Sequence, residues 1–225
     1  LLFVGKLDGW EAMKPGVPAE LPCIAYPLAP PTDYPGWDEI VKRTPPLQGE
    51  PLRDGGELCT IMYTSGTTGM PKGVMQSFET FAWSIHAGLK RVPIDTNSRM
   101  LSYLPLAHVA ERTLVEHGLL ATGMEVFFAE SLDTFTADLQ RARPTVFFSV
   151  PRLWVKFQQG VFAKMPPAKL ERLLKIPLLR GVVKKKILAA LGLDQCRFAA
   201  GGAAPMPPEL LGWYARLGLP IIEVY

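Results

Sequence analysis

The pattern of hydrophobic and polar positions changes at about residue 57. Beyond it, short apolar runs alternate with longer segments whose apolar residues recur with the period of a helix. Short apolar runs bounded by turn residues predict buried strands, and the helical period predicts amphipathic helices. The predicted strands are residues 58–63, 74–76, 100–104, 124–129, 145–150, 197–200 and 220–225. The predicted helices are residues 78–91, 107–120, 131–142, 152–163, 166–191 and 207–217.

Capping and breaking residues mark several ends of these helices. Ser77 and Ser131 stand where an N-cap is expected, because a hydroxyl accepts from the free N–H groups of a first turn. The basic region 166–191 is expected to break near Pro177 and Gly181. Repeated alternation of strands and helices predicts an α/β fold, a mostly parallel β-sheet with helices on both faces. In such a sheet, ligands bind at the carboxyl ends of the strands.

Residues 1–56 are rich in proline and glycine, which predicts mostly loop. We expect a buried strand at 1–4, a short strand at 23–26 and a short helix at 37–43. The chain then consists of an irregular lead-in, 1–56, and an α/β core, 57–225. Both ends of the chain fall within strand-like runs, so we expect a segment of a longer protein.

Composition and charge exclude several classes of protein. A net charge of +3 is too small to indicate nucleic-acid binding, and the run Lys184–Lys186 is expected to be a solvated helix face. Cys23, Cys59 and Cys196 are too far apart to suggest a metal site, and we expect reduced, buried thiols. No stretch is apolar over the roughly 18 residues that a transmembrane helix needs.

The richest chemistry lies in residues 63–74, YTSGTTGMPKGV, directly after a predicted strand. Glycines allow backbone N–H groups to approach an anion, hydroxyls donate hydrogen bonds, and Lys72 adds a positive charge. The Walker A pattern does not fit, because Pro71 precedes the lysine and Gly73 follows it, where that pattern needs glycine and a hydroxyl residue. A plain surface turn is the alternative.

The segment resembles the phosphate-binding signature of the adenylate-forming superfamily, which includes acyl-CoA synthetases, peptide-synthetase adenylation domains and luciferases. The resemblance implies that the loop and Lys72 hold the β- and γ-phosphates of ATP, and that Thr64 lies nearest the Mg²⁺ ion. The implied phosphate-binding residues are Thr64, Ser65, Gly66, Thr67, Thr68, Gly69 and Lys72.

A second segment, YLPLAHVAER at 103–112, resembles a core motif of the superfamily in its long-chain fatty acyl-CoA synthetase form. The resemblance implies that His108 lies beside the acyl carboxylate and the reaction centre. A histidine at the N-terminus of a helix is the alternative. Glu111 and Arg112 are expected to form a structural ion pair, and Glu79 and Glu116 to be surface or structural groups.

Two further segments resemble nucleotide-binding parts of the family. Residues 197–205, RFAAGGAAP, resemble the stretch whose backbone flanks adenine and the acyl group, and Tyr225 matches the aromatic residue that stacks on adenine. The implied adenine-binding residues are Gly201, Gly202, Ala203, Ala204, Pro205 and Tyr225, with Gly201 also beside the acyl chain. A tight turn from strand to helix is a compatible interpretation of residues 197–205.

The segment VPRLW at 150–154 resembles the part of long-chain synthetases in which a tryptophan gates the fatty-acid tunnel. Trp154 is the implied gate, and a core tryptophan on an amphipathic helix is the alternative. His86 is a weaker candidate near the acyl or CoA channel, whereas His117 is expected to be a surface or satisfied histidine.

Together these motifs imply part of the large N-terminal domain of a bacterial-type long-chain fatty acyl-CoA synthetase, without its small C-terminal domain. The implied reaction uses ATP, Mg²⁺, a fatty acid and coenzyme A, and Lys72 and His108 are its catalytic residues in this chain. We expect a cytoplasmic location and leave peripheral membrane contact open. The alternatives are an enzyme that loads a carrier protein or activates an amino acid, and a non-catalytic nucleotide-binding remnant.

Overall fold

The computed structural model describes residues 1–50, 52–64 and 70–224. The chain forms two compact units, residues 1–52 and 53–225. The predictions for Ser65–Gly69 and for Tyr225 lie outside the described residues.

The first unit is built around a short parallel pair of strands. β1 (Leu2–Val4) pairs with β2 (Cys23–Ala25), and the unit adds α1 (Trp10–Met13), the 3₁₀ turn η1 (Lys14–Gly16) and α2 (Trp37–Arg43). Phe3 stacks on Tyr26 with ring centroids 5.2 Å apart, and Trp37 packs against both rings edge-on. The predicted short strands and the helix at 37–43 are confirmed, but β1 is not fully buried, since Phe3 is 42% exposed.

The second unit holds the parallel sheets that the alternating pattern predicts. β5 (Arg99–Ser102) pairs with β6 (Glu125–Phe128), and β7 (Val146–Ser149), β8 (Phe198–Gly202) and β9 (Ile221–Val224) pair in that order, all parallel. Thr145 joins the two sheets, because its N–H donates to the Arg99 carbonyl oxygen at 3.0 Å and its hydroxyl oxygen accepts from the Arg99 N–H at 2.9 Å.

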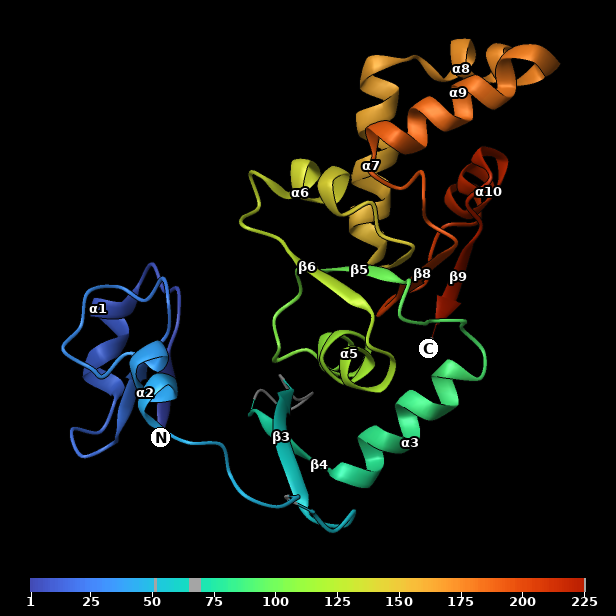
Figure 1. Ribbon diagram of the computed structural model, residues 1–225. Coiled ribbons are helices and arrows are strands. Elements are labelled where there is room, and N and C mark those ends of the chain that lie inside the picture. The colour runs from blue at the N-terminus through green and yellow to red at the C-terminus, as the bar shows by residue number, and fades with distance from the viewer. Residues whose placement is uncertain (51, 65–69, 225) are drawn as a thin grey trace. The chain divides into compact units, whose positions relative to one another are not determined.

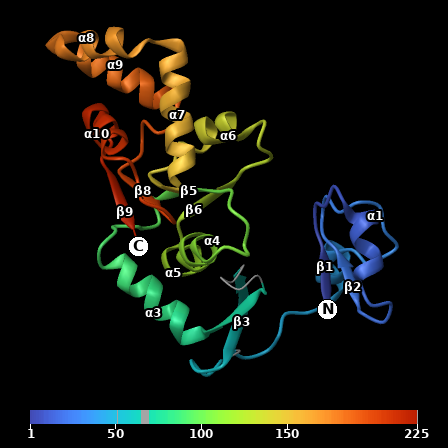
Figure 2. The ribbon, with the colours of Figure 1, turned by 180° about the vertical axis from the view of Figure 1, so that it is seen from behind.

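Helices cover both faces of these strands (Figures 1 and 2), so this part of the prediction is also confirmed. α6 (Phe135–Ala142), α7 (Pro151–Lys164), α8 (Pro167–Lys175), α9 (Pro177–Ala190) and α10 (Pro208–Leu217) contribute to the larger core. The opposite face is covered by the helical stretch from 109 to 122. Strand β7 shows the two-sided burial directly, since Phe147 points into the larger core and Phe148 into the smaller one.

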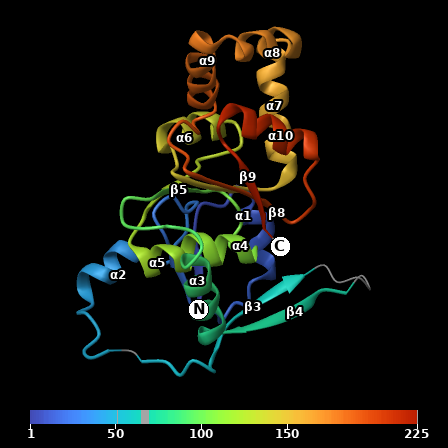
Figure 3. The ribbon, with the colours of Figure 1, turned by 90° about the vertical axis from the view of Figure 1, so that its right-hand side faces the viewer.

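A separate antiparallel hairpin carries the lysine of the glycine-rich segment. β3 (Leu58–Thr64) pairs with β4 (Lys72–Ser77), and Figure 3 shows the two strands side by side. Helix α3 (Phe78–Leu89) follows, and the Ser77 hydroxyl accepts from the Thr80 N–H at 3.2 Å. The predicted N-cap at Ser77 is therefore confirmed.

Three details of the predicted helices are wrong. The helix expected at 107–120 begins at Val109 and runs as α4 (Val109–Glu111), the π-helix η2 (Arg112–His117) and α5 (Gly118–Thr122). Helix α6 begins at Phe135, because Ser131 bonds to Thr134 in a turn that precedes the helix. Gly181 lies inside α9, and the chain breaks only at Ile176, before Pro177.

The cysteines are less buried than expected. The three cysteines are free thiols, and each is partly rather than fully buried. Among the described residues, no helix is both long and apolar enough to cross a membrane.

Candidate functional site

The carboxyl ends of β5, β7, β8 and β9 lie at the same edge, because these strands are parallel neighbours. Tyr103, just after β5, places its hydroxyl 3.0 Å from Ser149 Oγ and 3.2 Å from the Phe148 carbonyl oxygen at the end of β7. Burial raises the pKa of Tyr103 to about 12, so its hydroxyl stays a neutral donor. This bond ties together two of the strand ends that the sequence motifs follow.

His108 lies in the turn after β5 with one ring nitrogen already engaged. The Ala110 N–H donates to His108 Nδ1 at 3.2 Å, so His108 is the N-cap of α4. A ring that accepts at Nδ1 carries its proton on Nε2 when neutral. The helix-terminus alternative is thus realised, and it leaves Nε2–H, a hydrogen-bond donor, for a group outside this cap.

Glu111 is a buried carboxyl that anchors the turn containing His108. Its side chain accepts from the Ser102 hydroxyl and from the backbone N–H groups of Tyr103 and Leu104, and only 3% of the residue is exposed. Burial raises the pKa of Glu111, while these hydrogen bonds and nearby His108 act in the opposite direction. The carboxyl therefore fixes residues 102–104 at the strand end.

The expected ion pair between Glu111 and Arg112 is wrong. Arg112 donates to the Leu106 carbonyl oxygen at 2.9 Å and to Glu116 at 3.2 Å, one helical turn later. Adjacent residues of a helix point in different directions, whereas residues four apart share a face. Arg112 thus holds the turn at Leu106, while the Glu111 side chain holds residues 102–104 at the end of β5.

Thr64 and Lys72 lie on either side of the glycine-rich loop and are partners across the β3–β4 hairpin. Thr64 Oγ1 lies 3.5 Å from the Lys72 carbonyl oxygen, and both side chains are exposed. In the part of the chain that the structure describes, Lys72 forms no ion pair with a carboxylate. An exposed, unneutralised ammonium beside this loop fits an anionic ligand such as a phosphate chain.

Magnesium fits the described residues poorly. No group of three or more His, Cys, Asp or Glu side chains in the described ranges could hold a metal ion. Thr64 supplies one hydroxyl, whereas protein sites for Mg²⁺ use one or two carboxylates together with substrate phosphates. We therefore assign no step to a metal held by these residues alone.

The turn after β8 combines buried glycines with an exposed tip. A Cβ on Gly201 would lie 2.3 Å from Met206 Sδ and 3.5 Å from Trp154 Nε1, and one on Gly202 would lie 2.9 Å from the Val224 carbonyl oxygen. Ala203 has a φ of 69°, in the left-handed region, and residues 203–205 are exposed. The tight-turn interpretation thus explains both glycines, and the exposed tip remains accessible to a ligand.

Trp154 is fully buried beneath this turn. Its ring packs edge-on against Phe147 and Tyr214, with centroids 5.3 Å and 4.9 Å away, and the Tyr214 hydroxyl donates to the Trp154 carbonyl oxygen at 2.7 Å. Trp154 Nε1 has no hydrogen-bond partner among the described residues. In this structure Trp154 is a core residue whose indole N–H faces the backbone at Gly201.

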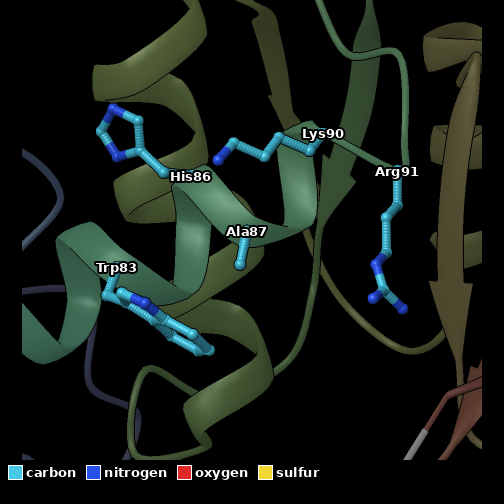
Figure 4. A pocket seen from close by; sticks show the side chains of 5 residues that line it. All are labelled: Trp83, His86, Ala87, Lys90 and Arg91. Carbon is cyan, nitrogen blue, oxygen red and sulfur yellow. The ribbon is translucent and has the colours of Figure 1, made fainter.

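The remaining histidines lie in α3 and the π-helix. His117 stacks on Phe81 with ring centroids 4.1 Å apart and bonds through Nδ1 to the Arg112 carbonyl oxygen at 2.8 Å, so it is satisfied as predicted. His86 lies 2.7 Å from the Ala82 carbonyl oxygen through Nδ1. It lines a pocket of about 230 Å³ that the sequence interpretation missed (Figure 4), together with Trp83, Ala87, Lys90 and Arg91.

Comparison with known proteins relates this chain to AMP-binding enzymes. Residues 15–225 match the family model described as AMP-binding enzyme. The chain is 33% identical over 87% of its length to the long-chain-fatty-acid–CoA ligase ACSBG2 of Gallus gallus, and covers 30% of that protein. It is 30% identical over 75% of its length to the putative fatty-acid–CoA ligase fadD11 of Mycobacterium tuberculosis, and covers 35% of that protein.

A solved structure agrees with the same assignment. The A-PCP didomain of a carboxylic acid reductase from Segniliparus rugosus, determined in complex with AMP, matches with a TM-score of 0.65 and 29% identity. The match covers 84% of this chain and 27% of that one. This chain thus spans about a third of the length of such relatives, and by sequence and by fold it belongs to the family of AMP-binding enzymes.

Proposed function

We propose that the protein activates a long-chain fatty acid with ATP and transfers the acyl group to coenzyme A. In the first step a carboxylate oxygen attacks the α-phosphorus of ATP, and the bond to pyrophosphate breaks. In the second step the CoA thiolate attacks the acyl carbon, a thioester forms and AMP leaves. The observation that carries this proposal is the anchored His108 at the carboxyl edge of the sheet, in a chain whose relatives are named as fatty-acid–CoA ligases.

Positioning and charge neutralisation are the main tasks in the first step, because a carboxylate is already ionised at neutral pH. Nε2–H of His108 donates to a carboxylate oxygen while Nδ1 stays engaged with Ala110. Lys72 neutralises charge on the phosphates, with the loop 64–69 as donors. The exposed turn 203–205, Gly201, Gly202 and Tyr225 flank the adenine, and Trp154 borders the acyl chain.

Magnesium, the inactivity of residues 1–225 alone and the cellular location also form part of this proposal. Mg²⁺ bound with ATP would shield phosphate charge, with Thr64 as the nearest protein group and other ligands from outside the described residues. Because the chain covers only about a third of its relatives' length, we expect residues 1–225 alone not to turn over. We also propose a cytoplasmic location with peripheral membrane contact.

A second candidate is transfer of the activated acyl group to a carrier protein instead of CoA. The likeness to an A-PCP didomain of a carboxylic acid reductase favours this candidate. Both candidates share the adenylation step, so the acceptor has to be tested separately from activation.

The test is ATP–pyrophosphate exchange by the full-length protein, with fatty acids of increasing chain length and with amino acids. Exchange that depends on a long-chain acid and disappears in Lys72→Ala and His108→Ala supports the proposal. Lys164→Ala, which removes an exposed lysine at the end of α7, is the matched control and should keep full exchange. Absence of exchange with every acid would exclude the adenylating activity. If exchange occurs, a separate assay of thioester formation with CoA decides the acceptor.

A further inference from the structure

Helices α8 and α9 form a hairpin at the amino edge of the sheet, remote from the candidate site. The two helices pack side by side beyond α7 (Figures 1 and 3), and Leu170 and Ile187 anchor them in the larger core. Helix α7 begins at the carboxyl end of β7 and leads away from it, and the chain returns through α9 to the start of β8. The hairpin is therefore separated from the carboxyl edge by the length of α7.

The hairpin is strongly basic. Residues 172–193 contain no acidic residue and six basic ones, whereas the whole chain has a net charge of only +3. The nearest acid in sequence, Glu171, pairs with Arg216 of α10. Within residues 1–50, 52–64 and 70–224, no ion pair involves any of the six, which are Arg172, Lys175, Arg180, Lys184, Lys185 and Lys186.

The tip of the hairpin is apolar and exposed. Leu178 is 89% exposed and Val182 is 52% exposed, and Ile176 and Leu179 are 43% and 42% exposed. A single exposed leucine is common on a protein surface, but four aliphatic side chains within seven residues, bordered by cations on both sides, form a patch. Lys185 and Lys186 are exposed and Lys184 is partly exposed, so these lysines follow the apolar tip along α9.

We propose that this tip docks on an anionic lipid surface. Ile176, Leu178 and Leu179 enter the boundary between headgroups and acyl chains, while the surrounding lysines and arginines contact lipid phosphates. The charge distribution favours lipid over an acidic protein. The unpaired cations lie on both helices around a protruding apolar point, and long flexible side chains can follow a fluid layer of anions.

The tip would make the membrane contact proposed above, and its docking does not depend on the chemistry of the carboxyl edge. Each basic residue near an anionic surface contributes about fivefold to membrane affinity, so three contribute on the order of a hundredfold. Burial of one leucine side chain contributes about tenfold. The electrostatic contribution should fall when the anionic lipid is diluted with neutral lipid and when salt is added, whereas the contribution of the leucine should not.

The experiment is co-sedimentation of the purified full-length protein with vesicles of phosphatidylcholine, with and without phosphatidylserine. We expect binding only to the anionic vesicles, about a hundredfold weaker for Lys184→Gln/Lys185→Gln/Lys186→Gln and about tenfold weaker for Leu178→Gln. The matched controls are Leu132→Gln, at a leucine that is 93% exposed on another turn, and Lys14→Gln/Lys42→Gln/Lys156→Gln. Both should bind as the unmodified protein does, and circular dichroism checks the folding of every variant.

Failure of the unmodified protein to bind anionic vesicles, or equal loss in the control variants, would overturn the proposal. The pyrophosphate exchange of each variant, measured without lipid, separates this result from the proposed function. Hairpin variants should exchange normally, and intact vesicle binding without exchange would count against the enzymatic proposal alone.

Discussion

Gly192 follows the end of helix α9 in a conformation and a space that suit glycine best. Its φ is +73°, its N–H donates to the Ala189 carbonyl oxygen, and the next N–H, of Leu193, donates back to Leu188. A Cβ on Gly192 would lie 2.6 Å from the carbonyl carbon and oxygen of Leu139, in α6. Backbone atoms of a packed helix cannot rotate away as a side chain does, so the helices would have to separate.

Replacement of Gly192 by Ala therefore combines two costs. The left-handed conformation costs an alanine about 1 kcal/mol relative to glycine, and forcing a methyl group into a packed interface costs about 1–3 kcal/mol. We expect Gly192→Ala to lower the free energy of unfolding by about 2–4 kcal/mol. Urea titration followed by the fluorescence of the buried Trp154 and Trp213 measures this difference.

The matched control is Gly181→Ala, in the interior of the same helix. No heavy atom lies within 4 Å of the position that its added methyl group would take, and its φ is not positive, so this change should raise stability by about 0.5–1 kcal/mol. Unfolding of Gly192→Ala at the same urea concentration as the unmodified protein, or equal loss of stability in the two alanine variants, would refute this explanation.

Three other predictions follow from buried polar groups. Burial raises the pKa of Glu111 above its usual value, so its carboxyl contributes stability at low pH that is lost as the pH rises through the raised pKa. Glu111→Gln removes the titrating group, so the free energy of unfolding, measured by urea titration at several pH values, should depend less on pH. Arg143 lowers the pKa of Asp194, so their ion pair stabilises the fold above that pKa and loses its effect in acid. Arg143→Asn, which tolerates the left-handed φ of 42°, should lower the free energy of unfolding at neutral pH and change it little at low pH, and equal losses at both would contradict this explanation. Tyr214→Phe removes a buried hydrogen bond of 2.7 Å to Trp154 and should cost about 1–2 kcal/mol in thermal unfolding, without a change of fold in circular dichroism.

The sequence predicts the α/β fold well because the strands of the core are buried on both faces. Residues 146–149 are all buried, so the strand appears as a continuous apolar run that turn residues bound. The helix ends are less predictable, since a serine near a helix start can cap the helix, as Ser77 does, or close a preceding turn, as Ser131 does. Gly181 shows the same limit, because tertiary packing of α8 and α9 overrides the weak helix propensity of a glycine.

The parallel topology predicts that the carboxyl ends of the strands lie at one edge of the sheet. The sequence does not predict the hydrogen bonds that join these ends. Tyr103 and Ser149 lie 46 residues apart, and no periodicity relates them. Adjacency in sequence suggests a pair between Glu111 and Arg112, but neighbours along a helix do not face each other. The spacing of four between Arg112 and Glu116 is the signal that identifies the correct pair.

Gly201 and Gly202 show why small residues alone are weak evidence for a ligand. Met206 and the Val224 backbone already occupy the space that a side chain would need, so packing requires both glycines whether or not a nucleotide binds. Ala203 is different: it adopts a left-handed φ of 69° that glycine would adopt without strain, and it lies on the exposed tip. Packing likewise does not explain two other residues. Lys72 is exposed and has no carboxylate partner in the described part of the chain, and in the same part no hydrogen bond engages Nε2 of His108. Support for a bound adenylate therefore comes from these three residues more than from the glycines that define the motif.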